Sequence, residues 1–264
     1  MTGPVHVTVW GCARRPAPRA VLVHGTMTWG TDEHGFAAQR PLADAAELWV
    51  VDRRGFGASP DVDRSDYALD ATDVAGLMAG GAHLVGHSYG GVVAMLAAAM
   101  RPGDVRSLTL IEPAAHRAAA GDAVVAAALA RMRATIAEAP SMTPEKWLRA
   151  STEAVGMGPL APTPTRLRAA ATAMRERPCW EADVPLGELA AASYPRLVIS
   201  GTWETAPAEY REAAGEALMA CAGAVGQAIG ADMLRVSGAS HWPHAERPEV
   251  VNAALRRLWR PAPA

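Results

Sequence analysis

A serine with glycines two residues away on either side is the first feature of this sequence that could do chemistry. The segment Gly86-His87-Ser88-Tyr89-Gly90 follows the short apolar run His83–Val85 and leads into the small and apolar residues Gly90–Met100. A sharp strand-to-helix turn of this kind strains the serine backbone and presents its Oγ at the top of a sheet. Glycines are needed there because a Cβ would collide with the neighbouring strand and helix. Ser88 is therefore predicted to be a nucleophile that attacks an ester-like or otherwise activated carbonyl.

Acyl transfer through Ser88 needs two hydrogen-bond donors for the oxygen that becomes negative in the tetrahedral intermediate. One donor is expected from the main-chain N–H of the residue after the nucleophile, which here is Tyr89. The other is expected from the loop after an earlier strand, and the segment His24–Gly30 follows such an apolar run. We therefore predict an oxyanion hole made by the main chain of Thr26 and Tyr89, with His24 bracing the loop through hydrogen bonds.

A histidine near the carboxyl end of the chain could be the general base. His241 directly follows Ser237–Ser240, and these small residues would let a loop carry the imidazole to Ser88. There it could take the serine proton and later return it to the leaving group. His244 is the local rival, and we favour His241 because of its position next to the small residues. The other histidines are expected to pack in the core or lie at the surface: His6, His34, His83, His87 and His116.

The base needs a carboxylate that holds its tautomer and stabilises the imidazolium. Glu204 ends the segment Gly201-Thr-Trp-Glu204 after one apolar run, and Glu112 ends another in Ile-Glu-Pro. Both satisfy the chain order serine, acid, histidine. We favour Glu204 and keep Glu112 as the alternative. The alternative role of Glu112 is a structural contact or cap, and that of Glu204 is a solvated loop charge.

Large side chains lie within a few residues of each of these loops. If they point inward, they would line an apolar and partly aromatic substrate pocket; otherwise they pack the loops. The pocket candidates are Met27, Trp29, Trp203 and Trp242.

Short runs rich in valine, isoleucine and leucine alternate with helical segments, which indicates a mostly parallel sheet with crossover helices. The first run, Val5–Trp10, alternates and suits an edge strand. The expected buried strands are Arg19–Val23, Leu48–Asp52, His83–Val85, Ser107–Ile111, Arg196–Ser200 and Met233–Val236. Each ends in one of the turns considered above or in a similar one, and functional loops of open α/β sheets lie at the carboxyl ends of strands. The sequence therefore predicts that the chemical residues share one site.

Residues 114–190 interrupt the alternation of strands and helices, because they contain helical stretches and proline-rich breaks but no convincing strand. We predict a helical lid over the site, inserted after the sixth strand. The core would then consist of residues 1–113 and 191–264. The alternative is a longer, peripheral helical connection.

Composition limits the partners. The formal charge of −2 and the isoelectric point near 6.4 leave no basic excess for a nucleic acid. The amino terminus lacks a secretory pattern, and the most apolar stretch, Gly90–Met100, is too short for a membrane span. Three widely spaced cysteines argue against a disulfide framework and against a paired-cysteine zinc site. We therefore expect a cytoplasmic protein with no nucleic-acid or membrane partner; its oligomeric state is left open.

Across nearly its whole length the chain resembles the α/β-hydrolase superfamily, especially its lidded, esterase-like and haloperoxidase-like members. The segments that carry the resemblance are VLVHGT, VVDRRGFGASP, HLVGHSYGG, LTLIEP, LVISGTWE and VSGASHWPHAERPEVVNAAL. The resemblance implies Ser88 as nucleophile, His241 as base and the backbone of Thr26 and Tyr89 as oxyanion hole. Glu204 stands where relatives commonly carry an aspartate. DRRGFGAS resembles a structural loop of the family, which implies no catalytic role for Asp52, Arg53 or Arg54.

The expected activity is cleavage of a carboxylic ester or a related acyl substrate such as a lactone, thioester or activated amide. The substrate is expected to be a small apolar or ester-like molecule, and covalent acyl transfer needs no metal or organic cofactor. Ser88 in the nucleophile turn argues against the dehalogenase and epoxide-hydrolase branches, which resemble this fold but use an aspartate nucleophile. The alternative is a non-hydrolytic protein on the same scaffold: a small-molecule cyclase or lyase in a biosynthetic pathway, or a ligand-binding pseudo-hydrolase.

Overall fold

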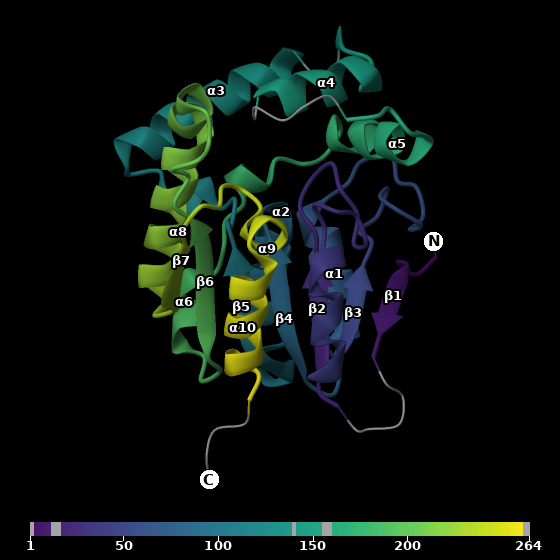
Figure 1. Cartoon of the computed structure of the whole chain (residues 1–264), viewed down its shortest axis with the longest axis vertical. Coiled ribbons are helices and arrows are strands. Elements are labelled where there is room, and N and C mark those ends of the chain that lie inside the picture. The colour runs from purple at the N-terminus through teal and green to yellow at the C-terminus, as the bar shows by residue number, and fades with distance from the viewer. Residues whose placement is uncertain (1–2, 12–16, 139–140, 155–159, 261–264) are drawn as a thin grey trace.

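The computed structural model describes residues 3–11, 17–138, 141–154 and 160–260. These residues form one seven-stranded sheet in the order β1-β3-β2-β4-β5-β6-β7, with β1 antiparallel to β3 and every other pair parallel (Figure 1). The strands are β1 (Val7–Trp10), β2 (Arg19–Val23), β3 (Glu47–Val51), β4 (Ala82–His87), β5 (Val105–Ile111), β6 (Arg196–Gly201) and β7 (Asp232–Val236). The prediction of a mostly parallel α/β sheet is confirmed.

The period-two alternation of strand side chains divides the apolar residues between the two faces of the sheet. On β2, Val21 and Val23 belong to one buried cluster, whereas Ala20 and Leu22 belong to the other. The strands are apolar on both faces because helices cover both. The sheet is therefore rigid, and it fixes the positions of the loops at its carboxyl ends.

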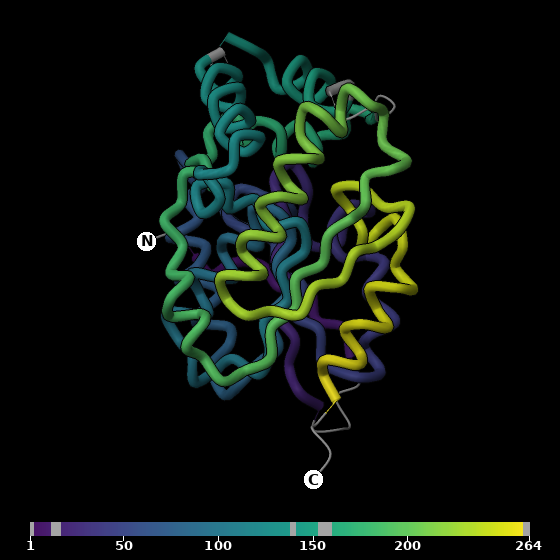
Figure 2. Tube along the Cα trace, turned by 90° about the vertical axis from the view of Figure 1, so that its left-hand side faces the viewer, coloured from purple at the N-terminus to yellow at the C-terminus, as the bar shows by residue number. Residues whose placement is uncertain are grey.

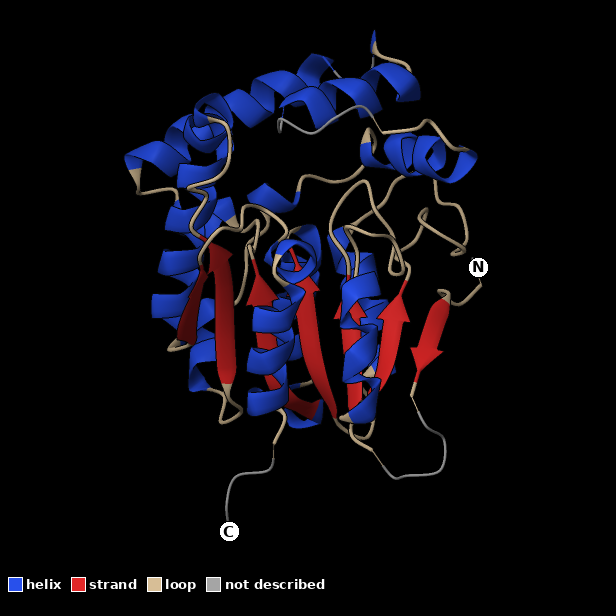
Figure 3. Ribbon diagram, in the orientation of Figure 1, coloured by secondary structure: helices blue, strands red, loops and turns tan. Residues whose placement is uncertain are grey.

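Helices pack against each face of the sheet. The first cluster includes side chains from α1 (Tyr67–Leu77), α2 (Tyr89–Met100), α6 (Leu186–Ala191) and α8 (Glu216–Ile229). The second includes side chains from the 3-10 helix η1 (Ala37–Asp44) and from α10 (Pro248–Leu258). The turned view shows α8 and α10 as separate layers (Figure 2), and the strands lie between the helices (Figure 3).

Helix α2 is the most apolar segment of the chain, and it lies in the core. Its buried residues include Val92, Val93 and Met95. In the described part of the chain, no helix is both long enough and apolar enough to cross a bilayer.

A helical insertion separates β5 from β6. It contains α3 (Ala123–Glu138), α4 (Pro144–Ala154) and α5 (Pro164–Ala173), which lie across the carboxyl-end side of the sheet (Figures 1 and 3). The prediction that it follows the sixth strand is wrong. The insertion follows β5, which is the fifth strand of the described residues and also the fifth of the strands expected from the sequence.

The carboxyl-terminal part of the insertion is attached to the core. Thr172 of α5 donates a hydrogen bond from its Oγ1 to the Gly55 carbonyl at 2.8 Å. Arg168 donates to the carbonyls of Gly57 and Ser59 at 2.6 and 2.7 Å. Beyond α5, Leu189 packs into the core cluster of α2 and α8. Within the predicted lid, α6 therefore belongs to the layer that covers the sheet.

Candidate active site

The loop between β4 and α2 places Ser88 at the carboxyl end of the central strand. Ser88 has φ 53° and ψ −115°, a left-handed backbone that an L-residue rarely adopts. Its N–H donates to the Ile111 carbonyl at 2.9 Å, which ties the strained turn to β5. A Cβ on Gly86 would lie 2.2 Å from the Gly90 carbonyl oxygen, and one on Gly90 would lie 2.1 Å from the Val23 carbonyl oxygen. The steric reason given for the two glycines is confirmed.

His241 lies on the loop between β7 and α9 (Pro243–Glu246), and its Nε2 is 3.1 Å from Ser88 Oγ. This distance allows the imidazole to accept the serine proton. The loop is held from beside the nucleophile, because His87 Nε2 donates to the His241 carbonyl at 2.8 Å. The side chain of His241 is 16% exposed, so it remains open to a substrate.

His244, the rival histidine, is in the core. It is fully buried, and its ring centroid lies 4.4 Å from that of His87 and 5.1 Å from that of Phe36. Burial lowers the pKa of His244 to about 3. The imidazole that contacts Ser88 is therefore that of His241.

Glu112 directly follows β5 and is fully buried. Its backbone has φ 46°. Its Oε1 accepts hydrogen bonds from Gly201 N at 2.7 Å and from Trp203 Nε1 at 3.5 Å. Its Oε2 lies 3.9 Å from His241 Nδ1, and neither of these two buried atoms has another hydrogen-bond partner. A hydrogen bond between these two facing atoms would remove the free-energy cost of leaving both buried and unpaired.

Glu204, the carboxylate favoured from the sequence, is hydrogen-bonded to the start of the loop that carries His241. It is exposed, and its Oε1 accepts from Ser237 Oγ at 2.7 Å and from Gly238 N at 2.8 Å. These hydrogen bonds, that from Ser237 first, lower the pKa of Glu204. Glu204 braces the start of the loop that carries His241. The geometry thus favours Glu112 as the partner of His241 and reverses the preference drawn from the sequence.

The loop after β2 passes directly over the nucleophile. A Cβ on Gly25 would lie 3.0 Å from His87 Nδ1 and 3.2 Å from the Cβ of Ser88, so a glycine makes this close approach possible without a shift of its neighbours. His24 braces the loop as predicted: its Nδ1 donates to the Gly25 carbonyl at 2.7 Å, and its Nε2 accepts from Arg53 N at 3.0 Å. Thr26 follows at an exposed position, and Met27 has φ 57°. The main chain that leads into Thr26 therefore lies next to Ser88.

The four pocket candidates divide into two groups. Met27, Trp29 and Trp242 are partly buried, and the ring centroid of Trp242 lies 5.2 Å from that of His241. Trp203 is fully buried and packs on Tyr210 with ring centroids 5.0 Å apart. Its positive φ of 59° turns the indole into the core, where it contacts Glu112. Trp203 therefore supports the carboxylate and does not line an open pocket.

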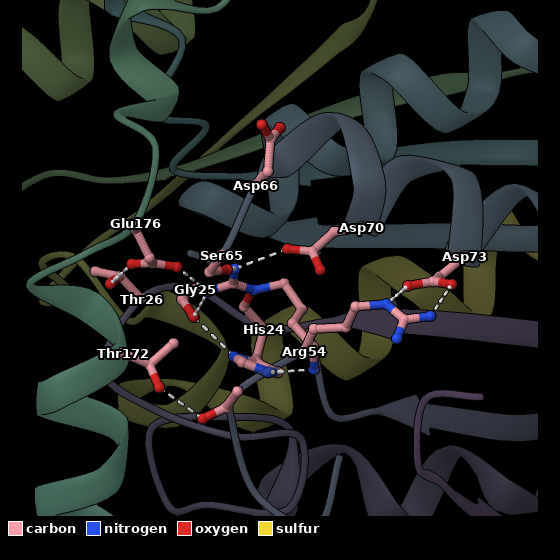
Figure 4. Close-up of polar contacts among 12 residues, drawn as sticks. His24, Gly25, Thr26, Arg54, Ser65, Asp66, Asp70, Asp73, Thr172 and Glu176 are labelled. Carbon is pink, nitrogen blue, oxygen red and sulfur yellow. Dashed lines mark hydrogen bonds and ion pairs between the residues drawn. The ribbon is translucent and has the colours of Figure 1, made fainter. Parts of the chain in front are cut away.

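A buried ion network next to the site is absent from the sequence-based prediction (Figure 4). Arg53, whose side chain is inaccessible to solvent, donates to Asp70 Oδ2 at 3.0 Å and to Glu176 Oε1 at 2.8 Å. Although burial opposes its charge, the carboxylates of Glu176 and Asp70 raise the pKa of the guanidinium. Arg53 lies in the DRRGFG motif, which the resemblance identifies only as a structural loop. Glu176 belongs to no motif, so nothing local in the sequence marks it.

Comparison with known proteins identifies the family of this chain. A family model described as "Alpha/beta hydrolase family" matches residues 20–254. Among curated proteins, the pimeloyl-[acyl-carrier protein] methyl ester esterase of Aeromonas salmonicida is 40% identical over 96 residues, which cover 36% of this chain and 37% of that protein. The protein of the same name from Neisseria meningitidis is 37% identical over 102 residues, which cover 37% of this chain and 38% of the relative. These matches span little more than a third of each relative's length.

Solved structures match over almost the whole chain. A thermophilic esterase from Thermogutta terrifontis, solved with malate bound, has a TM-score of 0.64 and 25% identity, covering 96% of this chain and 92% of that one. An enol-lactonase from Burkholderia xenovorans has a TM-score of 0.60 and 22% identity, covering 96% and 95%. The second likeness shows the fold alone.

Proposed function

Because the chain belongs to the alpha/beta hydrolase family, we propose that it is a carboxylic ester hydrolase that forms an acyl-enzyme on Ser88. The observation that carries this proposal is the 3.1 Å contact between His241 Nε2 and the Oγ of a serine held at φ 53°. A strained serine next to an imidazole is what nucleophilic acyl transfer requires.

The reaction follows from the positions of these groups. His241 takes the Ser88 proton as Oγ attacks the carbonyl carbon, and a tetrahedral intermediate forms. The main-chain N–H groups of Thr26 and Tyr89 donate to its oxyanion. When the intermediate collapses, the imidazolium protonates the departing alcohol. Water then attacks the acyl-enzyme with His241 again as base. The bond between Ser88 Oγ and the acyl carbon breaks, the imidazolium returns its proton to Oγ, and the acid product leaves.

We assign the third position of the triad to Glu112. Catalytic hydrogen bonds are often long in unliganded enzymes and tighten in the complex with substrate. The 3.9 Å gap between Glu112 Oε2 and His241 Nδ1 fits this pattern, since both atoms are otherwise unpaired. Trp203 and Gly201 hold the other carboxylate oxygen and so orient the group.

The substrate class rests on the relatives and on the lining of the site. The curated relatives are named methyl ester esterases, and the Thermogutta protein is an esterase. Met27, Trp29 and Trp242 are partly buried around the loops of Ser88 and His241, which suits a small apolar ester. Helices α3 to α5 serve as a lid that selects among such esters. Cytoplasmic location and the lack of a nucleic-acid partner stay predictions from composition.

Hydrolysis of p-nitrophenyl esters of graded acyl length tests the proposal, with wild type and Ser88→Ala compared at equal protein concentration. We expect turnover by the wild type and a loss of about 10⁶-fold in kcat for the variant. Unchanged circular dichroism would show that the variant is folded. Turnover that survives in Ser88→Ala would contradict the mechanism. A folded wild type that binds esters without cleaving them would favour a ligand-binding or non-hydrolytic protein.

A further inference from the structure

We propose that Glu176 is a positioning residue for the oxyanion hole: it reaches from the helical insertion to Thr26 and holds the oxyanion loop in its active shape. The inference rests on the proposed function, and it adds a link between the insertion and the chemistry of Ser88.

A direct hydrogen bond joins the insertion to the oxyanion loop. The Thr26 hydroxyl donates a hydrogen bond to Glu176 Oε2, although the two residues are 150 positions apart in the chain (Figure 4). Glu176 lies just after α5, and its N–H donates to the Ala173 carbonyl at 3.2 Å. The next residue, Arg177, donates its N–H to the Ser65 carbonyl at 2.8 Å. The backbone of Glu176 thus lies between α5, which Thr172 attaches to the core, and Arg177, which is hydrogen-bonded directly to the core.

Arg53, the counterion of Glu176, also contacts the oxyanion loop. Arg53 binds Glu176 Oε1 and, with its remaining donors, reaches the oxyanion loop: Nη2 donates to the Gly25 carbonyl at 2.9 Å and Nε donates to the His24 carbonyl at 3.2 Å. Its guanidinium also lies 4.0 Å from the centroid of the Tyr89 ring. Both residues that are proposed to supply oxyanion donors, Thr26 and Tyr89, are therefore in contact with this buried pair.

The contact between Thr26 and Glu176 should affect the rate of the reaction. Hydrogen-bond donors stabilise an oxyanion only when they are already in place, and a displacement of about 1 Å can cost 100-fold in rate. A carboxylate paired with a buried guanidinium is a rigid acceptor, because leaving either charge alone in the core is costly. Loss of the contact with Thr26 should therefore slow the chemical step more than it weakens substrate binding.

The test uses Thr26→Val, which removes the hydroxyl and keeps the backbone N–H and the branched shape of the side chain. We expect kcat for an ester and the rate of Ser88 labelling by a fluorophosphonate to fall about 10- to 100-fold, with KM changed less than about threefold. Thr26→Ser restores the hydroxyl and should recover most of the loss. The midpoint of thermal unfolding should stay near that of the wild type for both variants.

A double-mutant cycle then identifies the partner. Glu176→Gln removes the charge that pairs with Arg53 and leaves a weaker acceptor for Thr26. If Thr26 and Glu176 act through their mutual contact, Thr26→Val should cost less in the Glu176→Gln background than in the wild type. Asp73→Asn is the matched control, because it makes the same chemical change in the adjacent ion pair with Arg54, where Arg54 Nε lies 2.6 Å from Asp73 Oδ2. This control should leave kcat unchanged.

Three results overturn the inference: wild-type labelling and turnover in Thr26→Val, equal losses in Thr26→Ser and Thr26→Val, or fully additive losses in the cycle. If Glu176→Gln fails to fold, the two Thr26 variants still decide between the outcomes. A wild type that neither turns over esters nor labels at Ser88 would instead defeat the proposed function, and this inference with it.

Discussion

The carboxylate of Glu112 faces the imidazole of His241, with Oε2 3.9 Å from Nδ1, although the two residues are on loops after different strands, β5 and β7. Glu112 is fully buried, and its other oxygen is held by Gly201 N and by Trp203 Nε1. A buried carboxylate with one oxygen anchored and the other aimed at a histidine is arranged to orient that histidine.

This relationship predicts different outcomes for two matched substitutions. Glu112→Gln should lower kcat by about 10³- to 10⁴-fold, because an amide neither holds the correct imidazole tautomer nor stabilises the imidazolium. Glu204→Gln should lower kcat less than about 10-fold, since its amide oxygen still accepts from Gly238 N and one hydrogen bond contributes about 1 kcal/mol. Steady-state kinetics on one ester check both variants. The reverse ranking would return the acid role to Glu204.

The tight packing of the nucleophile turn predicts a loss of stability for Gly90→Ala. The added Cβ would lie 2.1 Å from a main-chain carbonyl oxygen of β2, so the backbone has to move. Overpacking of this kind costs about 1–3 kcal/mol or more. Gly103→Ala is the control, because a Cβ there meets nothing within 4 Å. Chemical denaturation should show a lower unfolding free energy for Gly90→Ala alone, and equal stability of both variants would refute the steric account.

Burial of His244 predicts that acid weakens the fold. The pKa of His244 is lowered to about 3 by burial, whereas an unfolded histidine titrates near 6.5. Between these values the unfolded chain binds the extra proton, so the unfolding free energy falls as pH falls. Between pH 7 and pH 5, His244 alone should account for about 2 kcal/mol of this loss.

The variant His244→Gln, which has no proton to gain, isolates this contribution. Denaturation at pH 7 and pH 5 should show a smaller acid-induced loss for the variant than for the wild type. His6→Gln is the control, because it makes the same substitution at an exposed position. An identical loss in His244→Gln and the wild type would contradict the prediction.

The nucleophile turn and the parallel sheet could be predicted from the sequence because their signals are local. The glycines on either side of Ser88 have a steric reason within one turn, and the apolar runs report burial on both faces of the sheet. His241 also followed from its own neighbours, since the small residues before it form the loop that brings it to Ser88.

The choice between the two carboxylates could not be made in this way. Glu112 and Glu204 both follow a strand and both precede His241, so chain order does not distinguish them. The structure distinguishes them by burial and by side-chain direction, which depend on the positive φ of Glu112 and on the packing of Trp203 against it. Neither is a property of a short sequence pattern.

The network of Arg53 and Glu176 was also beyond the sequence. The two residues are 123 positions apart, and their contact depends on where α5 docks. The sequence motif identifies the loop of Arg53, but no sequence pattern identifies Glu176 as its partner.

Activation of Ser88 by His241 can be measured by mass spectrometry after fluorophosphonate treatment. Wild type, Ser88→Ala and His241→Gln would be treated in parallel, and the adduct mapped by peptide sequencing. We expect a single adduct on Ser88 in the wild type, none in Ser88→Ala, and labelling slowed by at least about 10³-fold in His241→Gln. An unlabelled Ser88 in the folded wild type, or undiminished labelling in His241→Gln, would contradict activation of Ser88 by His241.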